Sequence, residues 1–256
     1  MENINYIEKT ENKTAIIEIN RPKQLNALNI GIINEIEKKL NSLQTNNSIR
    51  SVIITGAGDK AFVAGADIKE FQGFSAKDAN RLSQQGKKKL FNKVAHFNKP
   101  VIAAINGYAL GGGLELALSC HIRLMSKTAR LGLPECSLGL IPGYSGTQRL
   151  PRIIGKNLAM EMILTSKMID AEEAYRIGLV NDVLDPDSLM LKSLDLANKF
   201  NRVSPEAVTS AIKSINACYL ENGEQIETQE FSQLFETNNF KEGVDAFLNK
   251  RKPNFN

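Results

Sequence analysis

Short strand-like runs alternate with helix-like segments over the first 155 residues of this chain. Residues 14–20, 51–56 and 101–105 are rich in apolar or β-branched side chains and end at turn-forming residues, which is typical of buried strands. Residues 30–43 carry isoleucine and leucine at helical spacing, and residues 76–97 have the pattern of a long polar helix. Because parallel strands need crossover connections, this alternation predicts an α/β core with a parallel sheet.

The pattern changes after Gly155. Helical segments dominate from Lys156 onward and are interrupted at Gly178, at the Asp185-Pro186 pair and at Pro205. The sharpest change in composition falls between residues 160 and 170. We therefore predict an α/β core over residues 1–165 that carries the functional site, and a helical C-terminal region over residues 166–256.

Composition and charge argue against several classes of protein. The net charge of +4 suits an anionic ligand but is too diffuse to indicate nucleic acid, and tryptophan is absent. The three cysteines, Cys120, Cys136 and Cys218, lack zinc-type spacing and fit a reducing compartment. Residues 1–10 are polar, and no apolar run approaches the ~18 residues of a membrane span. We expect a cytoplasmic protein that binds neither membranes nor nucleic acid.

The first motif that could carry chemistry is residues 107–117, which follow a strand and open an apolar helix. Its three consecutive glycines would let another molecule approach the backbone, and free amides at a helix start attract negative charge. Gly112 and Glu115 lie three residues apart and therefore face the same side of the helix. The alternative is that the glycines only permit tight packing while Glu115 caps the helix. The residues alone favour neither reading.

Two further motifs are weaker in isolation. Residues 60–70 follow a strand with small side chains that leave room for a ligand, and Asp67 is placed to cap the next helix. A purely structural loop explains that segment better. Glu135 lies in an apolar stretch bounded by glycine and proline, where burial would raise its pKa and suit it to donate protons. The alternative for Glu135 is a water-facing turn cap.

Other chemistries find little support. The chain contains no phosphate-binding Gly-Lys-Ser/Thr loop and no His-Glu-x-x-His or Cys-x-x-Cys metal motif. Gly56 and Gly58 lack the third glycine of a dinucleotide fingerprint. Ser119 and His121 are close in sequence, but no nucleophile-elbow motif accompanies them. The basic runs at residues 87–89 and 250–252 are more typical of solvated faces than of binding patches.

Taken together, residues 64–69, 103–117 and 133–150 resemble the enoyl-CoA hydratase (crotonase) family in order and spacing. The resemblance extends from residues 21–28 to residues 246–253, almost the whole chain, and includes residues 174–181. It implies a crotonase-like ββα superhelix, with a helical C-terminal region that mediates trimers and forms part of the coenzyme A pocket. Such trimers commonly pair into hexamers.

The resemblance also implies the roles of particular residues. Ala66 and Gly112 match the family's backbone oxyanion hole, which agrees with the helix-start argument above. Phe247 and Lys250 resemble residues that touch the nucleotide end of coenzyme A, sometimes across a subunit boundary. The full set expected to contact coenzyme A or the substrate is Ala27, Ala64, Asp67, Ile68, Lys69, Gly143, Phe247 and Lys250. The resemblance implies no metal and no resident cofactor. Coenzyme A belongs to the substrate.

The identity of two residues favours one reaction within the family, the reversible addition of water across the 2,3 double bond of a 2-enoyl-CoA. Hydratases resemble this chain in carrying glutamate at the positions of Glu115 and Glu135, whereas many isomerases, decarboxylases and dehalogenases replace one. An enoyl-CoA isomerase or another crotonase-type enzyme is the alternative, and a non-enzymatic RNA-binding relative is the alternative of another class.

The sequence departs from common family patterns at a few positions. His121 stands where aspartate is common, and Leu133 stands where several hydratases have glutamine. Tyr144 and Ser145 stand where small residues are frequent, and this pair is expected to alter the acyl pocket.

Overall fold

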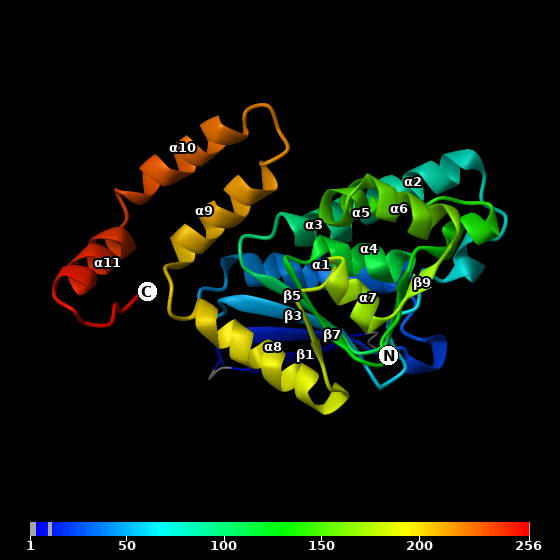
Figure 1. The fold of residues 1–256 in the computed structure, drawn as a ribbon, viewed down its shortest axis with the longest axis horizontal. Helices are drawn as coiled ribbons and strands as arrows, with labels where there is room; N and C mark the ends of the chain where they lie inside the picture. Colours follow the sequence, from blue (N-terminus) through cyan, green and yellow to red (C-terminus); the bar gives the residue numbers. More distant parts are fainter. Residues whose placement is uncertain (1–3, 10–11, 256) are drawn as a thin grey trace.

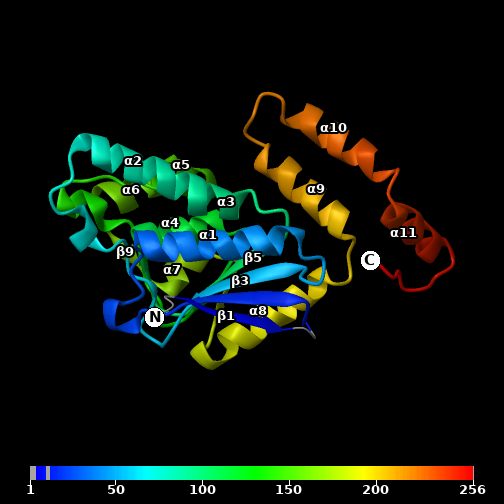
Figure 2. The same ribbon diagram turned by 180° about the vertical axis from the view of Figure 1, so that it is seen from behind.

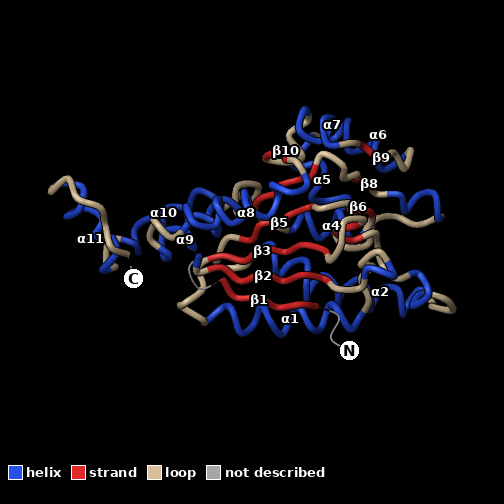
Figure 3. The backbone as a smooth tube through the Cα atoms, turned by 90° about the horizontal axis from the view of Figure 1, so that it is seen from below, coloured by secondary structure: helices blue, strands red, loops and turns tan. Residues whose placement is uncertain are grey.

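The computed structural model describes residues 4–9 and 12–255 and contains a large sheet built from six strands. Every neighbouring pair in it is parallel except the pair formed by residues 4–9 and 14–19. Figure 3 shows strands of this sheet side by side, in red. The strands, in spatial order, are β1 (Ile4–Lys9), β2 (Thr14–Ile19), β3 (Ser51–Gly56), β5 (Val101–Ile105), β7 (Ile122–Ser126) and β10 (Asp182–Leu184). The α/β core with a mainly parallel sheet is confirmed.

Helices cover both faces of the large sheet, which explains why its central strands are apolar throughout. Val52 of β3 faces the cluster that contains α1 (Ile30–Thr45), whereas Ile53 faces α8 (Pro186–Phe200). Figure 1 shows α8 on the opposite side of the sheet from α1 and α4 (Gly112–Ser119). Strands buried on both faces lose the alternation of polar and apolar residues.

A second, smaller sheet positions the candidate site. Its strands, in order, are β4 (Ala61–Val63), β6 (Tyr108–Leu110), β8 (Leu131–Gly132) and β9 (Met168–Ile169). The first three are parallel to one another, and β9 runs antiparallel to β8. These strands are two or three residues long, too short to give a periodic signal, and the sequence did not predict them.

The predicted helix over residues 76–97 is continuous but not uniform. It consists of α2 (Ala76–Gly86), a π-helical segment η4 (Lys87–Phe91) and α3 (Asn92–Ala95). Ser75 and Asp78 form a capping box at its start. The remaining helical elements of the core are η2 (Pro22–Gln24), η3 (Ile68–Phe71), η5 (Pro134–Leu138), α5 (Gly146–Ile154), α6 (Lys156–Leu164) and α7 (Ala171–Arg176).

The C-terminal region is mainly helical, but it is not helical throughout. Strands β9 and β10 follow residue 165 and pair with β8 and β7, so the chain returns to both sheets before it leaves the core. The division at residue 165 stays a prediction. Figures 1 and 2 both show α9 (Pro205–Asn216), α10 (Gly223–Leu234) and α11 (Asn238–Leu248) projecting away from the sheet.

The N-terminal segment contains a strand that the sequence did not predict. Residues 4–9 pair with β2 in antiparallel fashion, while residues 1–3 and 10 of the polar segment lie outside the described residues. Within residues 4–9 and 12–255, no helix combines the length and apolar character needed to cross a membrane.

Candidate active site

The three parallel strands of the small sheet deliver three predicted site residues to one edge. Ala66 follows β4, Gly112 follows β6 and Glu135 follows β8. Neighbouring parallel strands place their carboxyl ends together, so these residues converge. A Cβ atom built on Gly112 would lie 3.8 Å from the Ala66 nitrogen, and one built on Gly111 would lie 2.8 Å from Oε1 of Glu135.

The main-chain amides of Ala66 and Gly112 are both available to a ligand. Leu28 donates to the Gly65 carbonyl and accepts from the Asp67 amide, which leaves the Ala66 amide facing away from that bridge. Gly112 is the first residue of α4, where helical amides have no partner four residues earlier. Among the described residues neither amide has a hydrogen-bond acceptor. Two adjacent free amides can stabilise an oxyanion.

Glu115 lies on α4 three residues after Gly112 and is buried, with 1% of its surface exposed. Its Oε1 accepts hydrogen bonds from the main-chain amides of Tyr144 and Gly146, each 2.7 Å long. Burial raises the pKa of Glu115 to about 7; the Gly146 amide opposes this shift, and the charge of Glu135 adds to it. Glu115 therefore does not cap its own helix, and it titrates near neutral pH.

Glu135 enters the site from η5. Its Oε2 is buried and has no hydrogen-bond partner among the described residues, and burial raises the pKa of this carboxyl. Glu135 is half-buried and η5 has no side-chain cap, which disfavours the reading of Glu135 as a water-facing turn cap. A buried carboxyl oxygen without a partner favours the protonated form, which is the form needed to donate a proton.

The three glycines serve different purposes. Gly111 has φ +50°, and a side chain there would also press on Glu135. A Cβ atom on Gly113 would overlap the Val63 carbonyl, so this glycine permits tight packing of α4 on β4. Gly112 supplies the free amide. The packing alternative therefore holds for Gly113, and the backbone angle and the Glu135 contact explain Gly111. The ligand-binding role of Gly112 stays a prediction.

The predicted coenzyme A loops are tied to each other by Arg21. Its Nη1 donates to the Ala27 carbonyl at 3.0 Å, and its Nη2 pairs with Oδ2 of Asp67 at 3.2 Å. The Ala64 amide donates to the Leu25 carbonyl at 3.0 Å. The prediction that the Asp67 side chain caps a helix is wrong: Asp67 precedes the short η3, makes no side-chain cap and pairs with Arg21 instead.

Two more features of these loops bear on the prediction. Asn26 is fully buried with φ +57°, and its Nδ2 donates to the carbonyls of Ala57 and Ala61, which fixes the conformation of the first loop. Sequence reasoning did not single out Asn26 or Arg21, although both lie in a segment that resembles the family. Ile68 and Lys69 are exposed on η3, on the adjoining surface.

The last three predicted contacts differ in position. The carbonyl of Gly143 accepts from Oγ of Ser83 at 2.7 Å, and Gly143 directly precedes the Tyr144 amide that binds Glu115. Phe247, on α11, is 82% exposed, and Lys250 follows the end of that helix. Figures 1 and 2 show α11, the helix of Phe247, well away from α4, the helix of Glu115. Their role at the nucleotide end of coenzyme A stays a prediction.

Arg149 also contacts the turn that holds Glu115, and the sequence did not single it out. Its Nη1 donates to the Tyr144 carbonyl at 3.0 Å, and its Nη2 donates to Oδ1 of Asn92 at 2.8 Å. Its positive charge also lowers the pKa of Glu115, as the smallest of several contributions. Arg149 therefore braces the turn that holds Glu115.

The hydrolase alternative fails on geometry. Oγ of Ser119 donates to the Glu115 carbonyl, and Nδ1 of His121 accepts from the Val101 amide. With that tautomer Nε2 of His121 donates to the Ala95 carbonyl, so both ring nitrogens are occupied. Nor do the described residues contain a group of three or more His, Cys, Asp or Glu side chains suited to a metal ion.

The basic runs are partly satisfied within the chain. Nζ of Lys89 donates to Oδ1 of Asn34 at 2.7 Å. Arg251 pairs with Glu242 at 2.7 Å and also with Asp245. The two carboxylates offset the charge of Arg251, which weakens the RNA-binding alternative at the second run, whereas Lys89 binds a neutral amide and keeps its charge.

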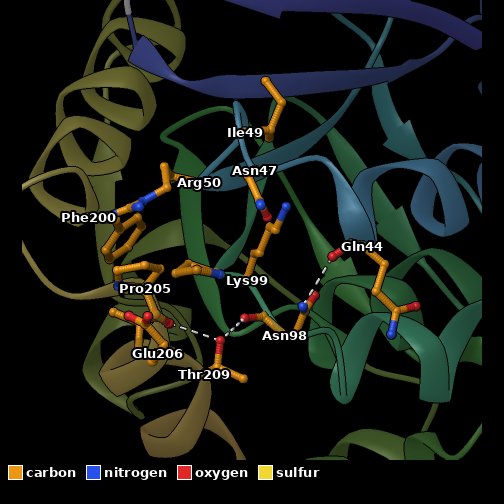
Figure 4. Close-up of a pocket in the computed structure, with 12 residues that line it drawn as sticks. Gln44, Asn47, Ile49, Arg50, Asn98, Lys99, Phe200, Pro205, Glu206 and Thr209 are labelled. Carbon is orange, nitrogen blue, oxygen red and sulfur yellow. Dashed lines mark hydrogen bonds between the residues drawn. The ribbon is translucent and has the colours of Figure 1, made fainter. Parts of the chain in front are cut away.

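A separate cavity of about 260 Å³ lies between the core and α9 (Figure 4). Its two cationic side chains already bind main-chain carbonyls: Arg50 that of Val203, and Lys99 those of Leu43 and Asn46. None of the predicted site residues lines it. The cavity therefore lies at the junction between the C-terminal helices and the core, and it is not the candidate site.

Comparisons with known proteins identify the family of this chain. The family model described as enoyl-CoA hydratase/isomerase matches residues 9–256. A short-chain-enoyl-CoA hydratase from Clostridium acetobutylicum is 42% identical over 98% of this chain and 97% of its own length. A crotonyl-CoA hydratase from Syntrophomonas wolfei is also 42% identical, with the same coverage. The crystal structure of an enoyl-CoA hydratase from Bacillus anthracis superposes with a TM-score of 0.92 at 39% identity, over 99% of this chain and 98% of that one. The ββα-superhelix architecture and the family resemblance are thereby confirmed, and the chain belongs to the enoyl-CoA hydratase/isomerase family.

Proposed function

We propose that this chain is an enoyl-CoA hydratase, which adds water reversibly across the 2,3 double bond of a 2-enoyl-CoA thioester to give a 3-hydroxyacyl-CoA. One observation carries the proposal: two glutamates with raised pKa values, Glu115 and Glu135, lie beside two free main-chain amides. The names of the Clostridium and Syntrophomonas relatives support the same reaction.

In the proposed mechanism, the amides of Ala66 and Gly112 bind the thioester oxygen. As water attacks the β-carbon, the electrons of the double bond move toward this oxygen, and the amides stabilise the enolate-like charge. The loss of one such donor typically costs about 100- to 1000-fold in rate. The 3.8 Å approach between the Ala66 nitrogen and the Cβ position of Gly112 supports a shared ligand atom.

The two glutamates move the protons. Glu115, as a carboxylate, takes a proton from the attacking water while the new carbon–oxygen bond forms. Glu135, protonated, delivers a proton to the α-carbon as the enolate collapses. A base that titrates near pH 7 and an acid whose burial favours protonation suit these roles at neutral pH. Dehydration reverses each transfer.

Coenzyme A enters as part of the substrate, and the mechanism uses no metal and no resident cofactor. We propose that the Arg21–Asp67 pair fixes the loops that carry Ala27, Ala64, Ile68 and Lys69 along the coenzyme A chain. Gly143, next to the turn that holds Glu115, borders the reacting end.

The active assembly is proposed to be a homotrimer, or a homohexamer made from two trimers, in the cytoplasm. Large apolar side chains on the projecting helices support this: Phe231, Phe247 and Leu248 are 63%, 82% and 72% exposed. An exposed apolar surface of this kind marks a partner interface. A second subunit would also bring Phe247 and Lys250 to a coenzyme A site that one chain leaves incomplete.

The proposal is tested with purified protein and crotonyl-CoA, following loss of the conjugated thioester absorbance and identifying 3-hydroxybutyryl-CoA as the product. Rapid hydration without added metal is the expected result. Turnover of a 3-enoyl-CoA to its 2-enoyl isomer, together with inertness on crotonyl-CoA, would replace hydratase by isomerase.

A further inference from the structure

The Tyr144 ring fills the space between the proposed oxyanion hole and helix α2. It is 7% exposed and stacks on Phe91 with the ring centroids 4.4 Å apart and the planes 10° from parallel. Its Cδ2 edge lies 3.6 Å from the Cβ position of Gly112. Its opposite edge lies against Gly86, where any Cβ atom would overlap the ring. The ring therefore spans from the thioester position to the helix behind it.

The same turn that binds Glu115 fixes this ring in place. The Tyr144 amide donates to Glu115, and its carbonyl accepts from Arg149. The preceding carbonyl, that of Gly143, accepts from Ser83 on α2. With the backbone held on both sides and Phe91 beneath the ring, the side chain has little freedom to move away from a ligand.

The ring presents an uncharged surface to the site. Burial raises the pKa of Tyr144 to about 12, and the negative charges of Glu115 and Glu70 add to the shift. The phenol therefore stays neutral over the working pH range, and the face and edge of the ring can contact an alkyl chain.

From these contacts we infer that the Tyr144 ring is the wall that ends the acyl pocket and restricts the enzyme to short 2-enoyl chains. The inference rests on the proposed function. With its thioester oxygen on Gly112 and its β-carbon beside Glu115, a substrate directs the carbons beyond its double bond toward this ring. A crotonyl group ends one methyl beyond the double bond, whereas a 2-octenoyl chain continues for several methylenes.

Without the ring, a slot lined by Gly86, Phe91 and Gly112 would open. It would be apolar and continuous with the reacting end, so a longer tail could occupy it and gain apolar contacts. Each methylene accommodated or rejected in such a pocket changes specificity by about tenfold or more. Removal of the ring should therefore change which substrate is preferred, and should not change all rates equally.

The experiment compares kcat/KM for 2-octenoyl-CoA with kcat/KM for crotonyl-CoA in the full-length protein. We expect the octenoyl-to-crotonyl ratio to rise about tenfold or more in Tyr144→Ala and by less in Tyr144→Leu. Leucine keeps an apolar contact with Phe91, so Tyr144→Leu provides the test if the alanine variant fails to fold. Tyr144→Phe should keep the wild-type ratio, because it keeps the ring. Tyr175→Ala, which removes an exposed tyrosine on α7, is the matched control and should also keep it.

Calorimetric binding of octanoyl-CoA separates this inference from the proposed function. We expect tighter binding to Tyr144→Ala and Tyr144→Leu than to the wild type, whether or not the protein turns over enoyl substrates. If the wild type turns over neither 2-enoyl substrate, but the Tyr144 variants still bind octanoyl-CoA more tightly than the wild type does, the hydratase proposal is overturned and the role of Tyr144 as a wall is kept. If the wild type hydrates crotonyl-CoA, but the Tyr144 variants show the same octenoyl-to-crotonyl ratio and the same octanoyl-CoA binding as the wild type, the role of Tyr144 as a wall is overturned and the hydratase proposal is kept.

Discussion

The carboxylate of Glu115 accepts a 2.7 Å hydrogen bond from the main-chain amide of Gly146, the first residue of α5. The buried carboxylate is thus held by the free amide at the start of another helix, where the helix dipole favours negative charge. This contact, together with the Tyr144 amide, offsets part of the cost of burial and keeps the pKa of Glu115 near neutral pH.

Stability should depend on pH through Glu115. Its pKa of about 7 in the folded protein lies above the ordinary value of 4.5, so the folded state keeps its proton to higher pH than the unfolded chain. The resulting stabilisation is complete below pH 4.5 and is lost as the pH rises through 7. In Glu115→Gln this loss, at most about 3 kcal/mol, should disappear.

Urea unfolding of wild type and Glu115→Gln between pH 4.5 and 8 measures that difference. Glutamine keeps an oxygen acceptor for the amides of Tyr144 and Gly146. The difference between the two proteins therefore reports the titration of the Glu115 carboxyl and not the loss of these hydrogen bonds. Parallel pH dependences for the two proteins would show that Glu115 is not the titrating group.

Gly111→Ala should reduce crotonyl-CoA hydration by about 100-fold or more, a loss comparable to that of a general acid. The added Cβ atom would lie 2.8 Å from Oε1 of Glu135, on a backbone with φ +50°. Gly178→Ala is the matched control: it has a similar φ of +72° but open space around the added atom. That variant should lose some stability and keep its turnover. Equal losses of activity in both would assign the effect to backbone strain alone.

Arg149→Gln should move the acidic limb of the pH–rate profile to higher pH. Arg149 lowers the pKa of Glu115 and braces the Tyr144 carbonyl, so its removal leaves the base protonated to a higher pH. The measurement is kcat/KM for crotonyl-CoA across pH 5 to 9. Arg152→Gln, an exposed neighbour on the same helix, should leave the profile in place. A rate loss that is uniform across pH would contradict an electrostatic role for Arg149.

The large sheet could be predicted from sequence because its central strands are buried on both faces. Residues 51–56 and 101–105 have no exposed face to break their apolar runs, and each ends at a turn. The small sheet could not be predicted, because β8 and β9 have only two residues each, which is too short for any periodicity.

The site was predicted in part for similar reasons. Local spacing placed Gly112 and Glu115 on one side of one helix, because α4 carries both, but only the family resemblance favoured a site there over tight packing. The partners of Glu115 could not, because Tyr144 and Gly146 come from a turn about thirty residues later that only the tertiary fold brings close. Asp67 was predicted to cap a helix because the helical segment that follows it is visible in the sequence. Its actual partner, Arg21, is distant in the sequence, and only the tertiary fold brings the two together.

The pairing of the two glutamates is best tested by kcat/KM for crotonyl-CoA hydration in wild type, Glu115→Gln, Glu135→Gln and the double variant. Each single change should reduce the rate by about 100- to 10,000-fold, and the double variant should lose much less than the product of the two, because one acid–base pair is already disabled. Near-wild-type hydration in either single variant would contradict the two-glutamate mechanism.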